Sequence, residues 1–155
     1  MGTILFKSVG KTVSELLSEP TGSIAPIGIM TPMRLGKKGE GIFAMHYKLR
    51  DQVRDNLRNL ILTNHGERLG IYNFGANLRE LTSELIASED FENEAVERIR
   101  LAVNQFMPFI ELSTFTSNIE QFNNQNVGKI IITIKYTIPA LGSTNEQLDV
   151  VLGVM

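Results

Sequence analysis

The spacing of hydrophobic and polar residues divides the chain into a helical half and a strand-rich half. Three segments place apolar residues at the spacing of one buried helix face: 46–62, 77–86 and 92–106. After Pro108, which cannot continue a helix, the period falls to two in three segments: 110–120, 129–138 and 147–154. The pattern predicts helices first and an antiparallel meander afterwards.

The segment 129–138 has the clearest strand pattern. Its aliphatic and aromatic residues alternate with Thr and Lys, and one predicted face is formed by Ile130, Ile132, Ile134, Tyr136 and Ile138. Between the first two predicted helices, residues 63–76 mix turn formers with apolar residues and predict a short strand or hairpin. Asn77 followed by Glu80 predicts a capping pair at the start of the second helix. The predicted fold class is α+β, with three helices packed on a small antiparallel sheet.

The N-terminal 41 residues predict an extended arm. They hold seven of the thirteen Gly and three of the five Pro, with no long periodic segment. Their apolar side chains nevertheless need a surface to cover, and the candidate docking residues are Ile24, Ile27, Ile29, Met30 and Met33. We therefore expect a docking arm at 1–41 and an α+β domain at 42–155. Two alternatives stay open: the arm wraps its own domain, or it binds a partner.

Composition excludes several classes of function. The 155-residue chain has a formal charge of −2, which argues against binding nucleic acid through phosphate neutralisation. It has no Cys, so disulfide scaffolds, thiol catalysis and cysteine-ligated metals are excluded, and its two His are 19 residues apart. We expect no metal, no cofactor and no membrane span, and a soluble protein made in a cytoplasm.

Catalytic motifs are absent from the sequence. There is no Gly-rich phosphate loop and no GxSxG nucleophile motif. Glu67, Glu80 and Glu84 are the candidates for the paired carboxylates of a cell-wall glycosidase, which would need one carboxyl with a raised pKa. Glu80 already has a predicted capping role, and Glu84 falls on a predicted solvent face. We therefore expect a protein that is not an enzyme, with the glycosidase as the alternative class.

The last predicted strand is weakly protected against pairing with another chain. Residues 147–154 carry a single charged side chain, Asp149. The edge formed by Val150, Val151 and Leu152 is therefore a candidate site for strand addition by a partner. The alternative is that the N-terminal arm covers this edge.

One part of the sequence resembles a known family. Leu60 to Arg68, followed by Asn73 to Leu78, resembles the small baseplate wedge proteins of contractile phage tails, which share a fold with a type VI secretion baseplate subunit. The residues that match in order and spacing are Thr63, Gly66, Arg68, Phe74, Gly75 and Leu78, with Glu67 inside the same stretch. The likeness extends over about residues 46–153 and does not cover the first 40.

The resemblance implies a structural role in a virion. Its implied partners are the tail sheath protein and larger wedge proteins, with tail tube or hub proteins as further candidates, and its implied location is the tail baseplate, assembled in the host cytoplasm. The sheet would act as the template for the first sheath ring. The equivalent subunit of a non-phage contractile injection system is the alternative.

The resemblance also assigns roles to single residues. The family commonly has Glu-Pro-Arg after the third helix, to hold the wedge bundle, whereas this chain has Met107, Pro108 and Phe109. An apolar contact through Met107 and Phe109 would replace the charged one. Gly66 and Gly75 are expected to permit backbone conformations that disfavour a Cβ, Phe74 to pack beneath the start of the second helix, and Arg68 to bind a carboxylate or loop carbonyls.

Overall fold

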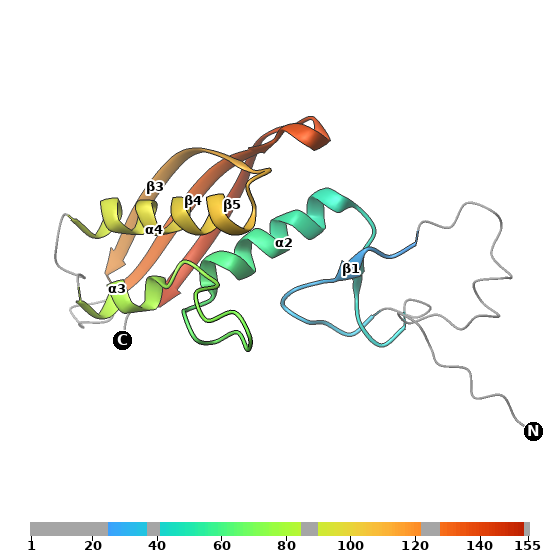
Figure 1. The fold of residues 1–155 in the computed structure, drawn as a ribbon, viewed down its shortest axis with the longest axis horizontal. Helices are drawn as coiled ribbons and strands as arrows, with labels where there is room; N and C mark the ends of the chain where they lie inside the picture. Colours follow the sequence, from blue (N-terminus) through green and yellow to red (C-terminus); the bar gives the residue numbers. More distant parts are fainter. Residues whose placement is uncertain (1–24, 37–40, 85–89, 122–127, 154–155) are drawn as a thin grey trace, which may run out of the picture. The chain divides into compact units, whose positions relative to one another are not determined.

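The computed structural model describes residues 25–36, 41–84, 90–121 and 128–153 (Figure 1). The chain forms two compact units, one up to Asp55 and one from Asn56 onward. Helix α2 (Leu49–Leu62) contributes its first half to one unit and its second half to the other. The two units are described separately below.

The first unit contains a narrow antiparallel ribbon. Strand β1 (Gly28–Ile29) pairs with β2 (Met45–His46), and a further bridge joins Leu35 to Phe43. Between these points the Met30 N–H donates to the Ala44 carbonyl at 3.0 Å. The described part of the predicted arm therefore pairs with the residues just before α2. Residues 1–24, including the predicted docking residue Ile24, lie outside the described part of the chain.

Asp55 of α2 fastens this ribbon to the helix. Its Oδ2 accepts hydrogen bonds from the Thr31 N–H at 2.8 Å and from Nε2 of His46 at 2.7 Å, and His46 is buried. Burial of the carboxyl acts to raise the pKa of Asp55, but the hydrogen bonds from Thr31 and His46 and the charge of His46 outweigh it and lower that pKa.

Asp55→Ala is expected to loosen the ribbon. Loss of hydrogen bonds to a charged acceptor costs about 2 kcal/mol, so the Thr31 amide should exchange with solvent roughly 30-fold faster. In the unaltered chain, this stabilisation is complete above the ordinary carboxyl pKa of 3.8 and is lost as the pH falls through the lower folded pKa. Amide exchange measured by NMR checks both effects, with Asp51→Ala on the same helix as the control. Equal exchange in the two variants would contradict this role.

The second unit is an α+β structure, which confirms the predicted fold class. Helices α3 (Leu78–Glu84) and α4 (Asp90–Phe106) precede strands β3 (Glu111–Gln121), β4 (Gly128–Ile138) and β5 (Ser143–Gly153), and a short 3₁₀ turn, η1 (Pro139–Leu141), separates β4 from β5. The strands form an antiparallel meander in the order β3-β4-β5, and α4 lies across one face of it (Figure 1).

The predicted inner face of β4 is the centre of the core. Ile130, Ile132, Ile134, Tyr136 and Ile138 are each at most 3% exposed. The helices contribute further buried residues to this unit, among them Leu57, Leu60, Ile61, Leu78, Leu81, Ile99 and Val103. Every second residue of β4 is buried, whereas the buried residues of α2 and α4 follow the helical period. Both patterns therefore mark the sides of these elements that belong to the hydrophobic core.

Residues 63–76 form no strand, contrary to the sequence prediction. The segment is a loop of successive turns, in which the Glu67 N–H donates to the Asn64 carbonyl and the Phe74 N–H donates to the Ile71 carbonyl. Each of these hydrogen bonds joins residues three positions apart, as in a β-turn. In a strand, the same N–H groups would instead donate to a neighbouring strand. The alternation of apolar residues in this loop reflects exposed side chains at its tip, including Leu69 and Tyr72.

The capping of α3 also differs from the predicted Asn77–Glu80 pair. The Arg79 N–H in the first turn donates to the side-chain oxygen of Asn64, at 3.2 Å. Asn77 has a positive φ of 51°, and its own side-chain oxygen accepts from the His65 N–H instead. Asn77 and Glu80 do form a pair, because Nδ2 of Asn77 donates a hydrogen bond to Oε2 of Glu80 at 2.5 Å. A residue distant in sequence thus supplies the cap.

Both outer strands of the sheet have an edge without a further strand in the part of the chain that the structure describes. Strands β3 and β5 each pair only with β4, and the described arm residues pair with β2 instead. Alternate residues of β3 and β5 therefore direct backbone groups away from the sheet. Within the described residues, no helix is both long and apolar enough to span a membrane.

Candidate partner-binding groove

Three segments of the second unit enclose a groove of about 600 Å³. It lies between the second half of α2, the loop at 63–75 and the segment that follows α4. Six of its lining residues were singled out from the sequence: Thr63, Glu67, Arg68, Phe74, Met107 and Phe109. The other four are Asn56, Asn59, Leu60 and Phe106. We call this the Phe74 groove.

Two aromatic rings and one guanidinium that line the Phe74 groove contact one another. The rings of Phe74 and Phe106 are 4.9 Å apart at 59°, and the Arg68 guanidinium carbon lies 4.2 Å from the Phe74 centroid. Phe74 therefore packs on Phe106, at the end of α4. Arg68 contacts a ring face, where the expectation was a carboxylate or loop carbonyls.

Backbone contacts hold the loop against α2. The Ala76 N–H donates to the Leu60 carbonyl at 3.2 Å, and the Asn77 N–H donates to the Thr63 carbonyl at 3.3 Å. Gly75 has a φ of +112°, and a Cβ there would lie 2.1 Å from the Thr63 carbonyl oxygen. The close approach of these two backbones positions Phe74 in the groove.

Glu67 is held by its own loop. Its two carboxylate oxygens accept from the Asn64 N–H at 2.8 Å and from the Asn64 side-chain amide at 2.9 Å. These hydrogen bonds lower the pKa of Glu67, whose side chain is exposed. A glycosidase acid needs the opposite shift, so this geometry argues against the catalytic alternative at Glu67.

Glu80 likewise has a structural pairing. Its Oε2 accepts from Arg98 at 3.0 Å as well as from Asn77, and the same Arg98 binds Glu94 at 3.0 Å. Arg98 also donates to the Asn77 carbonyl at 3.1 Å, which ties α4 to the start of α3. The side chain of Glu84, the third carboxylate considered, lies outside the described residues.

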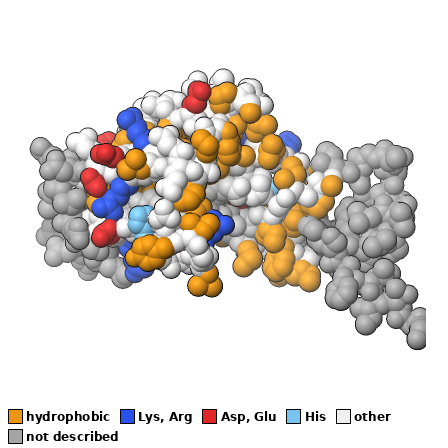
Figure 2. Space-filling view, viewed as in Figure 1, with side chains coloured by type: hydrophobic (Ala, Val, Ile, Leu, Met, Phe, Trp, Pro, Cys, Tyr) orange, Lys and Arg blue, Asp and Glu red, His pale blue; other side chains and the backbone are white. Residues whose placement is uncertain are grey.

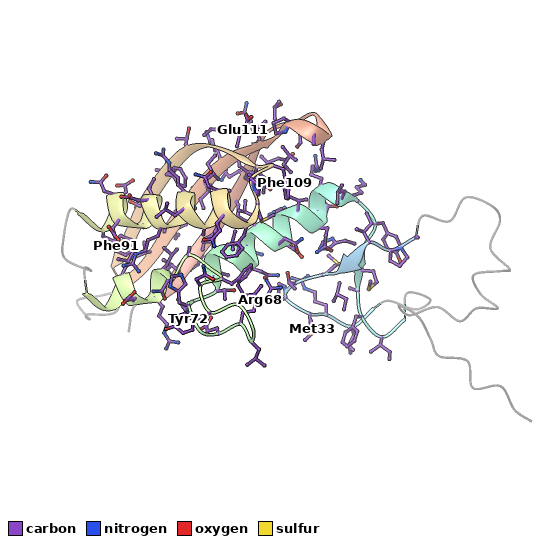
Figure 3. All side chains as sticks on the ribbon, in the orientation of Figure 1. Met33, Arg68, Tyr72, Phe91, Phe109 and Glu111 are labelled. Carbon is purple, nitrogen blue, oxygen red and sulfur yellow. The ribbon has the colours of Figure 1, made fainter. Side chains whose placement is uncertain are left out.

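The Met-Pro-Phe segment contributes to the Phe74 groove on its α4 side. Met107 is buried and Phe109 is 47% exposed, and both line the groove, while Pro108 is exposed and does not. Phe109 is labelled in Figure 3. The Met107 N–H continues the helix by donating to Val103, and the Ile110 N–H donates back to Met107. The segment therefore offers an apolar surface where the resembled family has charges.

The predicted β5 edge is separate from the groove. Val150 and Leu152 face the core side of β4, opposite Ile132 and Ile130. Val151 points to the other face and is 49% exposed. Within the described residues, β5 pairs with β4 alone.

Sequence reasoning did not single out Asn56 and Asn59 for the groove. Together with Thr63 they occur at i, i+3 and i+7, a spacing that places them on one side of α2. This row of polar residues, which runs into the loop that resembles the baseplate wedge family, could have indicated their place in the groove. Phe106 was assigned only to the apolar face of its helix.

A family comparison decides the identity of this fold. Residues 47–142, more than half of the chain, match the model of the family described as baseplate wedge protein gp25. The chain belongs to the gp25 baseplate wedge family. The match includes every residue of the Phe74 groove and ends just before β5. A search of curated proteins gives no significant match.

Two solved structures share the gp25-family fold. One is part of the cryo-EM structure of the anti-feeding prophage baseplate, with a TM-score of 0.57 and 16% identity over 74% of this chain and 85% of that one. The other is a crystal structure from Geobacter sulfurreducens named as a tail lysozyme, with a TM-score of 0.55 and 18% identity over 71% and 93% of the two chains. At these identities the likeness concerns the fold.

The arm residues precede the part that matches the gp25 family. Ile27, Ile29 and Met33 are exposed, and Met30 is half-buried. Further exposed apolar residues of this unit are Leu35, Ile42 and Phe43. Figure 2 shows hydrophobic side chains reaching the molecular surface in the view of Figure 1.

Proposed function

We propose that this gp25-family chain is a non-enzymatic baseplate subunit that starts sheath assembly by strand addition. The observation that carries the proposal is the edge of β5, which has no further strand beside it in the described chain. A sheath polypeptide that pairs with β5 would satisfy its outward backbone groups. The chain would then belong to the tail baseplate of a virion.

Two further surfaces would hold the chain in the wedge. The Phe74 groove would bind an apolar segment of a larger wedge protein, with Phe109 as an exposed anchor beside buried Met107. The apolar arm residues, including Ile27, Ile29 and Met33, would dock on a neighbouring wedge, tube or hub protein. Separate surfaces let one small subunit bind a wedge partner and the sheath at the same time.

The strand-addition proposal is tested at Val151. Val151→Pro removes one backbone donor, and Val151→Lys places a charge on the exposed face of the edge strand, a substitution that disfavours pairing. We expect baseplates carrying either variant to nucleate about tenfold fewer sheaths, counted by electron microscopy. Val151→Thr, which keeps both the shape and the strand preference, is the control.

Sheath nucleation that is unchanged in both variants would refute strand addition at β5. The Lys variant guards against the case in which Pro unfolds the domain, because Val151 is about half exposed and its side chain is outside the core. Thermal unfolding of each isolated variant completes the test. Genome neighbourhood separates a phage tail from a non-phage contractile injection system.

A further inference from the structure

We infer that the edge of β3 is a second strand-binding site, which takes an extended segment with an aliphatic side chain at its centre and Lys or Arg beside it. The inference rests on the proposed structural role of the chain but uses the sheet edge opposite to β5. The aliphatic side chain would enter a second groove, between β3 and α4, which we call the β3 groove.

The sheet is less completely covered at β3 than at β5. Ile134 and Ile132 of β4 are buried, and so are their β5 partners Leu148 and Val150. On the other side, Phe115 and Ser117 pair with the same two isoleucines yet remain half-exposed. The core therefore ends at β5 with buried side chains and ends at β3 with accessible ones.

The β3 groove occupies this accessible side. It encloses about 630 Å³, and its apolar lining comes from Val96 and Leu101 of α4 and Phe115 of β3. Leu101 is 62% exposed although it is a large aliphatic residue. The Arg100 guanidinium lies 5.4 Å from the Phe115 ring centroid. An aliphatic side chain placed here would cover apolar surface that the described residues leave exposed.

The backbone of β3 determines the conformation of the occupant. In an antiparallel edge strand, alternate residues direct their N–H and C=O groups outward, and in the described part of the chain β3 pairs with β4 alone. An extended segment satisfies such a row of groups, whereas a helix has already used its own. The register shift between Leu112 and Thr114 leaves Ser113 as an extra residue, so regular pairing is available from Thr114 onward.

The rim of the β3 groove determines the charge of the occupant. Glu92 and Glu97 are exposed on the α4 side. The cation of the same rim, Arg100, already contacts the ring of Phe115. A Lys or Arg that flanks the aliphatic side chain would meet these two carboxylates, whereas a flanking acid would be repelled by them.

Binding of defined peptides to the full chain tests the inference. The probe is a peptide of roughly nine residues, alternating Thr and Val, with Lys on each side of its central Val. It is compared with the same peptide carrying Glu at those two positions and with one whose central Val is Pro. We expect NMR shifts and slowed amide exchange within residues 114–118, at least about tenfold weaker binding of the Glu-flanked peptide, and none of the Pro peptide.

Matched variants locate the site. Leu101→Asn, which removes the apolar contact without adding charge, should weaken binding of the Lys-flanked peptide at least about tenfold, whereas Leu141→Asn, at another exposed leucine, should not. Changes confined to β5, equal binding of all three peptides, or equal effects of the two variants would overturn the inference. Failure of the Val151 sheath test would refute the role of β5 and leave this result unaffected, because the peptide assay contains no sheath.

Discussion

Gly75→Ala is expected to lower the free energy of unfolding by about 3 kcal/mol or more, the largest stability effect that we predict for this chain. A Cβ at this position would lie 2.1 Å from the Thr63 carbonyl oxygen and 2.7 Å from its carbonyl carbon. These are backbone atoms, and they cannot move away without breaking the hydrogen bond from the Asn77 N–H to Thr63. The positive φ of +112° adds conformational strain.

Gly70→Ala is the matched control for this prediction. Gly70 lies in the same loop with a φ of +84°, but an added Cβ there meets no atom within 4 Å. Its cost should be limited to the conformational strain, about 1–2 kcal/mol. Urea unfolding followed by circular dichroism measures both variants. Equal destabilisation would show that close approach to Thr63 is unimportant and that φ alone matters.

Phe109→Ala is expected to abolish most of the binding to a larger wedge protein. Phe109 is a half-exposed aromatic residue that lines a groove, which is a feature of an interface anchor. Truncating such an anchor costs about 2–4 kcal/mol, or roughly 30- to 1,000-fold in Kd. The isolated chain should keep its melting temperature within a few degrees, because Phe109 contributes little to the buried core.

Leu141→Ala controls for the loss of exposed apolar surface elsewhere. Leu141 is 39% exposed in η1 and does not line the Phe74 groove. Titration calorimetry with the purified wedge partner should show near-normal affinity for this control. If both variants bind with unchanged affinity, the groove is not the wedge site. If Phe109→Ala unfolds the chain, the residue is structural and the anchor role is wrong.

Sequence periodicity predicted most of the second unit. The residues that alternate on 129–138 form the buried face of β4, and the helical stripes on 46–62 and 92–106 correspond to α2 and α4. The first of these helices begins later than predicted, at Leu49, because His46 pairs in strand β2. These predictions succeeded because each element has one side in the core, so its local period is a direct record of burial. The loop at 63–76 has no such side, and its prediction as a strand or hairpin was wrong.

The resemblance indicated six lining residues of the Phe74 groove without indicating that they meet. Thr63, Phe74 and Phe109 are separated by up to 46 positions (109 − 63), and no periodicity relates a loop to a segment beyond a later helix. Their convergence depends on the packing of the Phe74 ring on Phe106, at the end of α4. The capping of α3 by Asn64, in place of Asn77, depends on the same folding of the loop.

By itself, the sequence determined the long helices and the three strands of the second unit, because hydrophobic burial imposes a period that short stretches of chain display. Only the tertiary structure decided which strand edges have no further strand beside them among the described residues, since pairing depends on what lies beside a strand and not on its own residues. It also decided that the Arg68 guanidinium contacts the ring of Phe74 and that the Asp55 carboxylate accepts a hydrogen bond from the Thr31 N–H. These contacts join residues that become neighbours only when the chain folds, so the local sequence around each residue does not predict them.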